Sequence, residues 1–395
     1  MCWKACGTEE GRMKFVVDYR SGKWDMSTLC EAYDISRVTG YKWLERFMLE
    51  GIEGLKDRSR APHEHPNATP PWARERIIAE RLKRPTWGAR KLKGFLEDRE
   101  DLALPAESTI GDILRKEGLT TAQKKRRHVP PYTNPFEEAD RPNRVWCVDF
   151  KGDFHTKDGQ HCYPLTIQDA YSRFLLDCRG LHRTSYAETR PVFEQAFRTY
   201  GIPDFIKSDN GSPFASVAVG GLTQLSAWWV KLGIRPERIA PAHPEQNGRL
   251  ERFHRTLKAE TIKPPKATFT EQQKAFDTFR EEYNGIRPHE ALGMRTPSAL
   301  YLPAEKTFDP AADRIVYPGC YEMRFVRQSG EIKISSKLWY LSETLVHERV
   351  GLKTIANGLH EVYYGPVFLC YLDESLPKVV RKLSRKRSCE LGREV

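Results

Sequence analysis

The feature that most constrains the fold is a set of short strands in the middle of the chain, interrupted by a single helix. Three segments are rich in β-branched and aromatic residues and are bounded by turn residues, as strands are: residues 144–150, 163–168 and 174–179. Apolar residues at helical spacing follow over 186–200, and a fourth strand is predicted over 204–208. This order predicts an α/β domain with a mixed sheet, which we place at residues 142–305.

One strand of this domain carries an acid that packing does not require. Asp149 lies in the apolar and aromatic run Val145-Trp-Cys-Val-Asp-Phe150, and a buried carboxylate must be paired, protonated or bound to a metal ion. Asp209 directly follows the strand at 204–208 and precedes Asn210-Gly211. An Asp at such a place is more often a simple turn residue, so its functional interpretation depends on the other acids.

A third acid lies on a helix that is predicted over residues 246–260. Three apolar residues would form the buried stripe of this helix: Leu250, Phe253 and Leu257. Glu251, Arg255 and Lys258 share the roughly opposite face, which we expect to line a cleft. For an isolated helix, the plain alternative is a solvated salt bridge between Glu251 and Arg255.

Three carboxylates from two strand ends and a helix could hold a pair of hard divalent cations through oxygen ligands. Two such ions stabilise the attacking and the leaving oxygen of an in-line phosphoryl displacement, so no protein nucleophile is needed. Water would nick the DNA, and the exposed 3′-hydroxyl would attack a target phosphodiester. In this hypothesis Arg255 and Lys258 hold phosphates beside Asp149, Asp209 and Glu251.

The charge of the chain suits a polyanionic partner. Its formal net charge is +11, although a merely soluble basic enzyme is the alternative. Two helical segments in front of the α/β domain each have a helix-turn-helix layout, and we place them in domains of residues 1–60 and 61–120. Either segment alone could be a plain helical hairpin. Two of them in succession on a basic chain favour DNA binding.

The first helical domain has apolar residues at helical spacing between residues 12 and 50: Phe15, Val16, Tyr19, Leu29, Ala32, Val38, Tyr41 and Leu44. Ser36 is the expected N-cap of its last helix, which we predict over 37–47. In a helix-turn-helix layout the early residues of that helix face the major groove of DNA. Three residues are predicted to do so: Arg37, Thr39 and Lys42.

The second helical domain ends with a helix that begins at Glu107-Ser108-Thr109-Ile110 and stops at Gly118. Ser108 and Thr109 are its predicted DNA contacts. A basic, proline-rich linker follows at residues 121–141. Its charge run is either a solvated linker or a phosphate-binding segment, and we favour phosphate binding by four residues: Lys124, Lys125, Arg126 and Arg127.

The C-terminal part is strand-like and rich in turns, which predicts a small β-barrel at residues 306–375, followed by a disordered basic tail at 376–395. The nine cysteines include no C-x-x-C pair, so reduced, mostly buried thiols are expected rather than a zinc ribbon or a disulfide framework. No stretch approaches the roughly 18 apolar residues of a membrane span. We therefore expect a soluble protein of the cytoplasm or nucleoid that has no membrane partner.

The three acids and their neighbours resemble the catalytic signature of bacterial insertion-sequence transposases of the DDE superfamily, which have a retroviral-integrase-type core. The resemblance lies in these motifs: Trp-Cys-Val-Asp149-Phe-Lys, Ser-Asp209-Asn-Gly, Gln-Asn-Gly-Arg-Leu-Glu251-Arg followed by Lys258, Arg287-Pro288-His289, Gly40-Tyr-Lys-Trp-Leu44 and Trp87-Gly-Ala89. It extends over most of the chain, roughly residues 12 to 370. The zinc module of the retroviral members is absent from the sequence, and helix-turn-helix domains occupy its place.

This resemblance implies a ribonuclease H-like core in which Asp149, Asp209 and Glu251 bind two Mg²⁺ ions, with Mn²⁺ as a substitute. The implied reaction is cleavage and strand transfer at the terminal inverted repeats of a transposon. Its partners would be the double-stranded DNA of the transposon ends and of the target. Action on two ends implies a homodimer or a higher homo-oligomer.

Two other classes of protein stay open as alternatives. One is a catalytically silent DNA-binding regulator or assembly factor, and the other is a nuclease of the same fold that cuts without joining. Four histidines at irregular spacing are interpreted as solvent or phosphate contacts rather than as a metal site: His155, His161, His243 and His254. Two tryptophans of a helix at 222–232 are expected in the core: Trp228 and Trp229.

Overall fold

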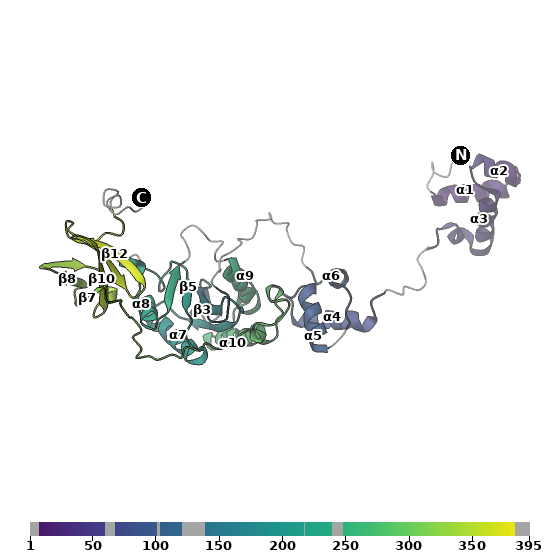
Figure 1. Ribbon diagram of the computed structural model, residues 1–395. Coiled ribbons are helices and arrows are strands. Elements are labelled where there is room, and N and C mark those ends of the chain that lie inside the picture. Colours follow the sequence, from purple (N-terminus) through teal and green to yellow (C-terminus); the bar gives the residue numbers. More distant parts are fainter. Residues whose placement is uncertain are drawn as a thin grey trace. The chain divides into compact units, whose positions relative to one another are not determined.

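The structure is a computed structural model that describes residues 8–59, 68–100, 103–120, 139–216, 218–238 and 248–383. The chain divides into two compact units, Met1–Thr69 and Pro70–Val395 (Figure 1). The first unit contains one helical domain. The second unit contains another helical domain, an α/β domain and a C-terminal β domain. The charge run at 124–127 and the end of the tail, 384–395, lie outside the described residues.

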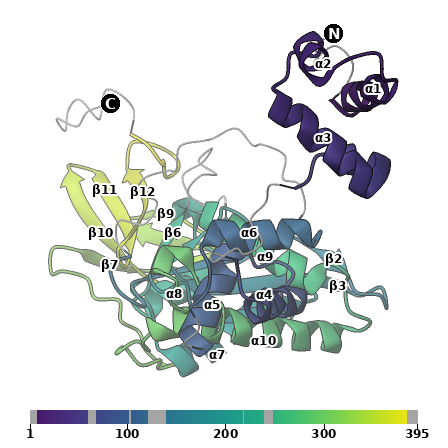
Figure 2. The same cartoon turned by 90° about the vertical axis from the view of Figure 1, so that its right-hand side faces the viewer.

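Three helices and a 3-10 turn form the first unit (Figure 2): α1 (Thr8–Arg20), α2 (Met26–Ala32), α3 (Arg37–Glu50) and η1 (Gly51–Leu55). Ser36 begins α3 as predicted, because its hydroxyl oxygen accepts a hydrogen bond from the backbone N–H of Thr39 at 3.2 Å. The helices enclose an apolar core that includes Phe15, Leu29 and Trp43. The short turn between α2 and α3 gives the expected helix-turn-helix layout.

Two apolar residues of α3 lie on a different side of the helix from the one that their spacing indicated. Val38 and Tyr41 are 79% and 56% exposed. Gly40 lies against the other helices instead, and a Cβ atom there would come within 2.7 Å of the sulfur of Cys30. This close approach turns Gly40 and Trp43 toward the core, so Val38 and Tyr41 face outward.

Three helices form the second helical domain, which opens the second unit: α4 (Pro71–Lys83), α5 (Ala89–Glu100) and α6 (Glu107–Lys116). The helix that was predicted to begin at Glu107 is α6. All three helices contribute to one apolar core, to which Ile77, Leu92 and Ile110 belong. Trp87 precedes α5 and is 3% exposed in the same core.

The second helical domain packs against the α/β domain through α5 and the residues just before it. Arg90 donates a hydrogen bond from Nη1 to the Glu290 carboxylate at 3.0 Å. The guanidinium carbon of Arg287 lies 5.8 Å from the centre of the Trp87 ring. Ile286 packs against the apolar core of the helical domain. These contacts join the two domains within the second unit.

The α/β domain is built on a six-stranded sheet: β1 (Val145–Phe150), β2 (Phe154–His155), β3 (His161–Asp169), β4 (Leu175–Leu181), β5 (Phe205–Ser208) and β6 (Arg235–Arg238). Strand β1 lies between β3 and β5. It pairs antiparallel with β3 and parallel with β5, while β3 pairs antiparallel with β4 and β5 pairs parallel with β6. The predicted mixed sheet is therefore confirmed.

Helices cover both faces of this sheet. Successive side chains of β1 point to opposite sides, so this strand contributes to an apolar core on each face. Trp146 and Val148 share one apolar core with α7 (Tyr186–Tyr200) and α8 (Gln224–Lys231). Val145 and Cys147 share a second core with α9 (Gly248–Leu257) and α10 (Phe269–Gly285). Two tryptophans of α8 are buried in the first of these cores, as predicted: Trp228 and Trp229.

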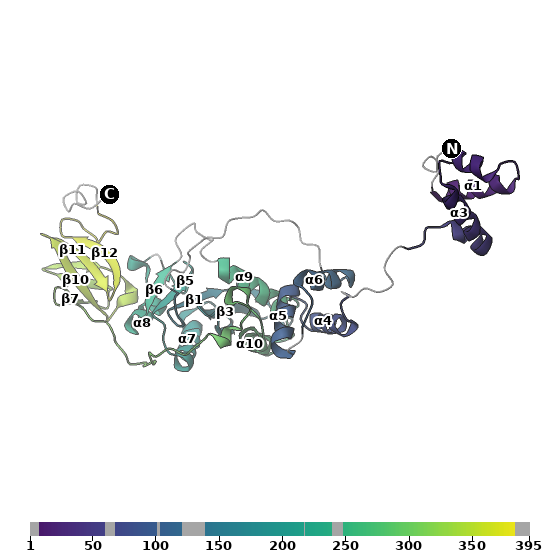
Figure 3. The ribbon, with the colours of Figure 1, turned by 45° about the vertical axis from the view of Figure 1, so that its right-hand side comes forward.

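The C-terminal domain contains two antiparallel sheets around one apolar core (Figure 3). One sheet has four strands: β7 (Glu322–Phe325), β10 (Arg349–Ala356), β11 (Leu359–Tyr364) and β12 (Val367–Asp373). The other has two strands: β8 (Glu331–Ile334) and β9 (Lys337–Tyr340). Within the described residues no strand ladder joins the two sheets, so the predicted small β-barrel is not confirmed. Val380 bridges Tyr371, so the start of the tail is ordered on β12, contrary to expectation.

Among the described helices, none combines the length and the apolar character that spanning a bilayer requires. Of the cysteines in the described segments, Cys320 is exposed and the others are buried. The expectation of mostly buried thiols holds for this part of the chain.

Candidate active site

Asp149 and Asp209 occupy equivalent positions in the register of two neighbouring parallel strands. The parallel pairing of β1 and β5 ends with Cys147 opposite Lys207. Each acid lies two residues beyond that pair, where neighbouring strands are about 4.8 Å apart. The two carboxylates therefore belong to the same edge of the sheet, at the carboxyl ends of two central strands.

The surroundings of the two acids differ. The Asp149 side chain is 16% exposed, and the alternation along β1 places it on the face that α9 covers. Asp209 is partly buried, and its Oδ1 accepts a hydrogen bond from the backbone N–H of Gly211 at 3.1 Å. Asp209 thus stabilises the turn after β5, as expected of a turn residue. Its position on the strand next to that of Asp149 is also compatible with a metal ligand.

The third acid lies on a helix whose buried stripe is the predicted one: Leu250, Phe253 and Leu257 are 3%, 5% and 0% exposed. Glu251, Arg255 and Lys258 are exposed. Within the described residues, no three His, Cys, Asp or Glu side chains lie close enough together to hold a metal ion. The register of β1 and β5 puts Asp149 and Asp209 at equivalent positions on neighbouring strands, and Glu251 lies on α9, which packs on one face of the sheet.

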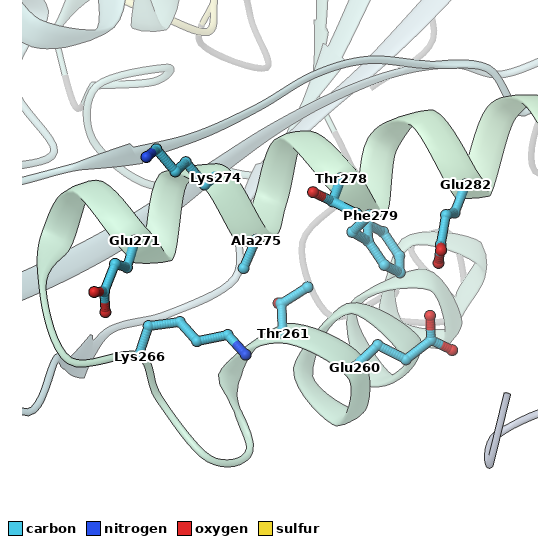
Figure 4. A pocket seen from close by; sticks show the side chains of 9 residues that line it. All are labelled: Glu260, Thr261, Lys266, Glu271, Lys274, Ala275, Thr278, Phe279 and Glu282. Atoms are coloured by element: carbon cyan, nitrogen blue, oxygen red, sulfur yellow. The ribbon is translucent and has the colours of Figure 1, made fainter. Parts of the chain in front are cut away.

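A cavity of about 420 Å³ lies close to these elements but does not include the three acids (Figure 4). It is lined by residues of α10 and of the π-helical turn η4 (Lys258–Ile262), among them Glu260, Thr261 and Phe279. The expected cleft in front of Glu251 and Arg255 is a different place, because neither residue lines this cavity.

His254 is buried, so its interpretation as a solvent or phosphate contact is wrong. It is 5% exposed, and its Nε2 lies 2.9 Å from the hydroxyl oxygen of Thr166. The same hydroxyl lies 3.1 Å from the backbone carbonyl oxygen of Asp149 and donates a hydrogen bond to it. The other ring nitrogen, Nδ1, lies 3.7 Å from the Asp149 carboxylate. His254 therefore connects the helix of the third acid with the strand of the first.

The protonation state of His254 follows from its burial. Burial, together with the positive charge of Lys151, lowers the pKa of His254 to about 3, so the ring is neutral near pH 7. Its place on the helix was visible in the sequence, because His254 continues the buried stripe of Leu250, Phe253 and Leu257 at spacing i, i+3, i+4 and i+7. The other three histidines do not belong to this helix and give no such signal.

The predicted DNA contacts have different environments. Arg37 and Lys42 are exposed on α3, whereas Thr39 is partly buried and its hydroxyl lies 2.9 Å from that of Ser36. The Thr39 hydroxyl therefore contributes to the N-cap of α3. On α6, Ser108 is exposed and Thr109 is partly buried. Lys124, Lys125, Arg126, Arg127 and His243 lie outside the described residues.

Family models agree with this organisation. Two models described as Integrase core domain match residues 139–244 and 232–297. The chain contains an integrase core domain. A model described as Helix-turn-helix domain matches residues 12–63, and one described as Homeodomain-like domain matches 39–114. Both predicted domain types are confirmed.

Relatives of this integrase-core protein include proteins of bacterial insertion elements. The insertion element IS407 uncharacterized 31.7 kDa protein of Burkholderia multivorans is 27% identical over 63% of this chain and 89% of its own length. The insertion element IS476 uncharacterized 39.2 kDa protein of Xanthomonas euvesicatoria is 30% identical over 46% of this chain and 50% of its own length. The resemblance to bacterial insertion-sequence transposases with an integrase-type core is confirmed.

Solved structures similar to the integrase core include two retroviral domains. The HTLV-2 integrase catalytic core domain in complex with magnesium is 17% identical, with 41% of this chain and 99% of that chain covered and a TM-score of 0.33. The catalytic core domain of BIV integrase is 18% identical, with 40% and 93% covered and a TM-score of 0.31. The assignment of a ribonuclease H-like integrase core rests on the family match and on the mixed sheet.

Proposed function

We propose that this protein is a DNA transposase that cuts DNA at transposon ends and joins those ends to target DNA. Asp149, Asp209 and Glu251 would bind two Mg²⁺ ions, for which Mn²⁺ can substitute. The observation that carries the proposal is that Asp149 and Asp209 occupy equivalent positions at the carboxyl ends of two adjacent parallel strands, with Asp149 on the face that α9 covers. The match to the integrase-core model and the similarity to insertion-element proteins support DNA transposition or integration in general.

The donor set suits a hard divalent cation, because carboxylate oxygens are its preferred ligands. Glu251 lies three residues before His254, and side chains at this spacing are neighbours on a helix, with Cβ atoms about 5 to 6 Å apart. Since His254 contacts Asp149, the exposed Glu251 carboxylate can approach the same sheet edge by turning about its own side-chain bonds.

The residues of this chain would act mainly by positioning. Bound Mg²⁺ ions would neutralise charge that develops on the transferring phosphate and on the attacking and leaving oxygens. Arg255 on α9 and Lys258 at the start of η4, both exposed, would hold neighbouring phosphates of the DNA. Neutral His254 would keep the Asp149 backbone in place through Thr166 without adding a charge to the site.

Single substitutions of the three acids test the proposal. We expect Asp149→Ala, Asp209→Ala and Glu251→Ala each to lower the rates of cleavage and joining on the order of a thousandfold or more, with binding of end DNA kept. The assay uses end duplexes and a supercoiled target, with Mg²⁺, with Mn²⁺ and with EDTA. Normal Mg²⁺-dependent joining by Glu251→Ala would show that the assignment of this acid is wrong.

Asp153→Ala is the matched control, because Asp153 is an acid of the same domain whose side chain is 51% exposed. Asp169 is unsuitable, since it is fully buried and accepts hydrogen bonds from Asn143 and Ser172. The control should cleave and join at the unsubstituted rate.

A DNA-binding regulator without catalysis is the second candidate. End binding without cleavage, in Mg²⁺ and in Mn²⁺, would select this alternative. Cleavage without joining when a target duplex is present would select the nuclease.

A further inference from the structure

Two large apolar side chains in the first turns of α3 are exposed to solvent. Val38 is 79% exposed and Tyr41 is 56% exposed, and both lie on the helix that follows the turn of the helix-turn-helix. A single exposed apolar residue is ordinary, whereas two neighbours on the early face of a recognition helix need a partner. The helix cannot rotate to bury them, because Gly40 fixes its opposite side against Cys30.

Cations flank this pair of side chains. Arg37 and Lys42 are exposed on the same face, and the segment from Arg37 to Leu44 contains no acid. The ion pairs in the described part of the first unit are made by other cations: Arg12, Lys14, Lys56 and Arg58. A surface that combines apolar groups with cations that make no ion pair in the described part of the unit complements a polyanion that carries apolar groups of its own.

A second copy of α3 is a poorer partner for the same face. Further along α3, Met48 is 74% exposed and has the spacing of a coiled-coil seam with Val38 and Tyr41. Glu45 is exposed at the middle of this seam. Pairing two copies in either direction would bring the two Glu45 carboxylates together, and like charges at a contact are unfavourable.

We propose that Val38 and Tyr41 contact the 5-methyl groups of thymines in the major groove of the transposon end. The inference rests on the proposed binding of end DNA by the first helical domain. The thymine methyl group is the apolar feature that a protein can contact in this groove, and it distinguishes thymine from the other bases. Arg37 and Lys42 bind phosphates or guanines on either side.

Replacing thymine by deoxyuridine tests the proposal, because the change removes the methyl group and keeps the hydrogen-bonding pattern. The full-length protein first selects a preferred duplex from a random pool, and its affinity for that duplex is compared with its affinity for the deoxyuridine version. We expect the uracil duplex to bind about tenfold more weakly. Equal affinity for the two duplexes, with selection of one sequence intact, would overturn the inference.

Variants assign the effect to residues. Val38→Ser and Tyr41→Ser should each reduce the ratio of thymine to uracil affinity, whereas Arg37→Ala should weaken binding to both duplexes and keep the ratio. Leu49→Ser is the matched control, since Leu49 is 76% exposed on the same helix but beyond its first turns. It should leave both affinities unchanged.

The remaining outcomes are distinguishable. If no duplex is enriched from the pool, the proposed end binding itself fails. If Val38→Ser and Tyr41→Ser change the oligomeric mass of the protein and leave the thymine-to-uracil ratio unchanged, the face belongs to a second copy and the inference is overturned.

Discussion

The two helical domains share a sequence signature and differ in what their cations do. In the first domain Arg37 and Lys42 on α3 are exposed and make no ion pair within the described residues. In the second domain four arginines form ion pairs with acids of the protein itself: Arg76, Arg84, Arg90 and Arg115. A helix-turn-helix pattern therefore indicates a shape, and the pairing of its cations indicates whether that shape is available to DNA.

Contacts with the integrase core extend the difference. The second domain uses Trp87 and Arg90 to contact Arg287 and Glu290. Its last helix begins with Glu107, which pairs with Arg90 beside the predicted DNA contact Ser108. We therefore expect base selection to come mainly from the first domain, while the second stabilises the core.

Removal of the first unit gives the largest expected effect. A chain that begins at Pro70 should lose preference for end DNA over random duplex on the order of a thousandfold, because weak electrostatic binding is what would be left. Fluorescence anisotropy with both duplexes measures the ratio, and circular dichroism shows whether the second unit stays folded. A ranking of sequences that survives the deletion would mean that the second domain reads bases.

Trp87→Ala tests the structural role of the second domain. Trp87 is 3% exposed and packs against Phe95, with ring centres 5.4 Å apart. Its removal should destabilise the second unit by about 3 kcal/mol or more. Denaturant titration followed by hydrogen exchange of α5 measures the loss. Trp24→Ala, at a site that is 48% exposed in the first unit, is the control and should change stability by less than about 0.5 kcal/mol.

Paired arginine substitutions compare the two domains directly. Arg37→Ala should cost about 1 to 3 kcal/mol of end-DNA binding, since it removes a free cation from the early face of α3. Arg115→Ala should have little effect, because Arg115 pairs with Asp112 on its own helix. Both affinities are measured on the same end duplex at several salt concentrations. Equal losses would erase the proposed distinction.

Lys91 gives the smallest effect and a pH dependence. Burial between the second domain and the core, with the nearby Arg287, lowers the pKa of Lys91 from 10.5 to about 8. The unfolded chain holds this proton more tightly, so the group destabilises the folded unit in full below pH 8, and the penalty fades as pH rises toward 10.5. Lys91→Met should raise the melting temperature by a few degrees at pH 7.

The gain from Lys91→Met should shrink between pH 8 and pH 10.5, and melting curves at several pH values measure it. Lys93→Met is the control on the same helix, because Lys93 pairs with Glu97. A gain that is constant across this pH range would mean that packing, rather than the charge of Lys91, is responsible.

Much of the integrase core could be predicted from the sequence, because its signals are strong and local. A strand such as Val145–Phe150 and a capped helix such as Tyr186–Tyr200 follow from periodicity alone. The equivalent positions of Asp149 and Asp209 follow because each acid lies near the carboxyl end of one of two paired parallel strands. Their place in the sheet could thus be anticipated from residue order.

The other features of the fold and of the site depend on contacts between distant segments, which the periodicity of the sequence does not predict. Gly40 sets the buried side of α3 by its approach to Cys30, and no apolar pattern reports such an approach. The role of His254 depends on Thr166, which lies on β3 far away in sequence. Pairing of Arg90 with Glu290 likewise joins distant segments. Each of these is a tertiary contact that overrides a local preference.

The link from His254 through Thr166 to Asp149 also bears on timing. Helix α9 is fixed against β1 at that point, so the third carboxylate would reach the sheet edge by rotation of the Glu251 side chain, without displacement of the helix. Exposed side chains change rotamer within picoseconds to nanoseconds, whereas helices shift over microseconds to milliseconds. Gathering the three acids would then be far faster than turnover, and slower events such as the pairing of two DNA ends would set the rate.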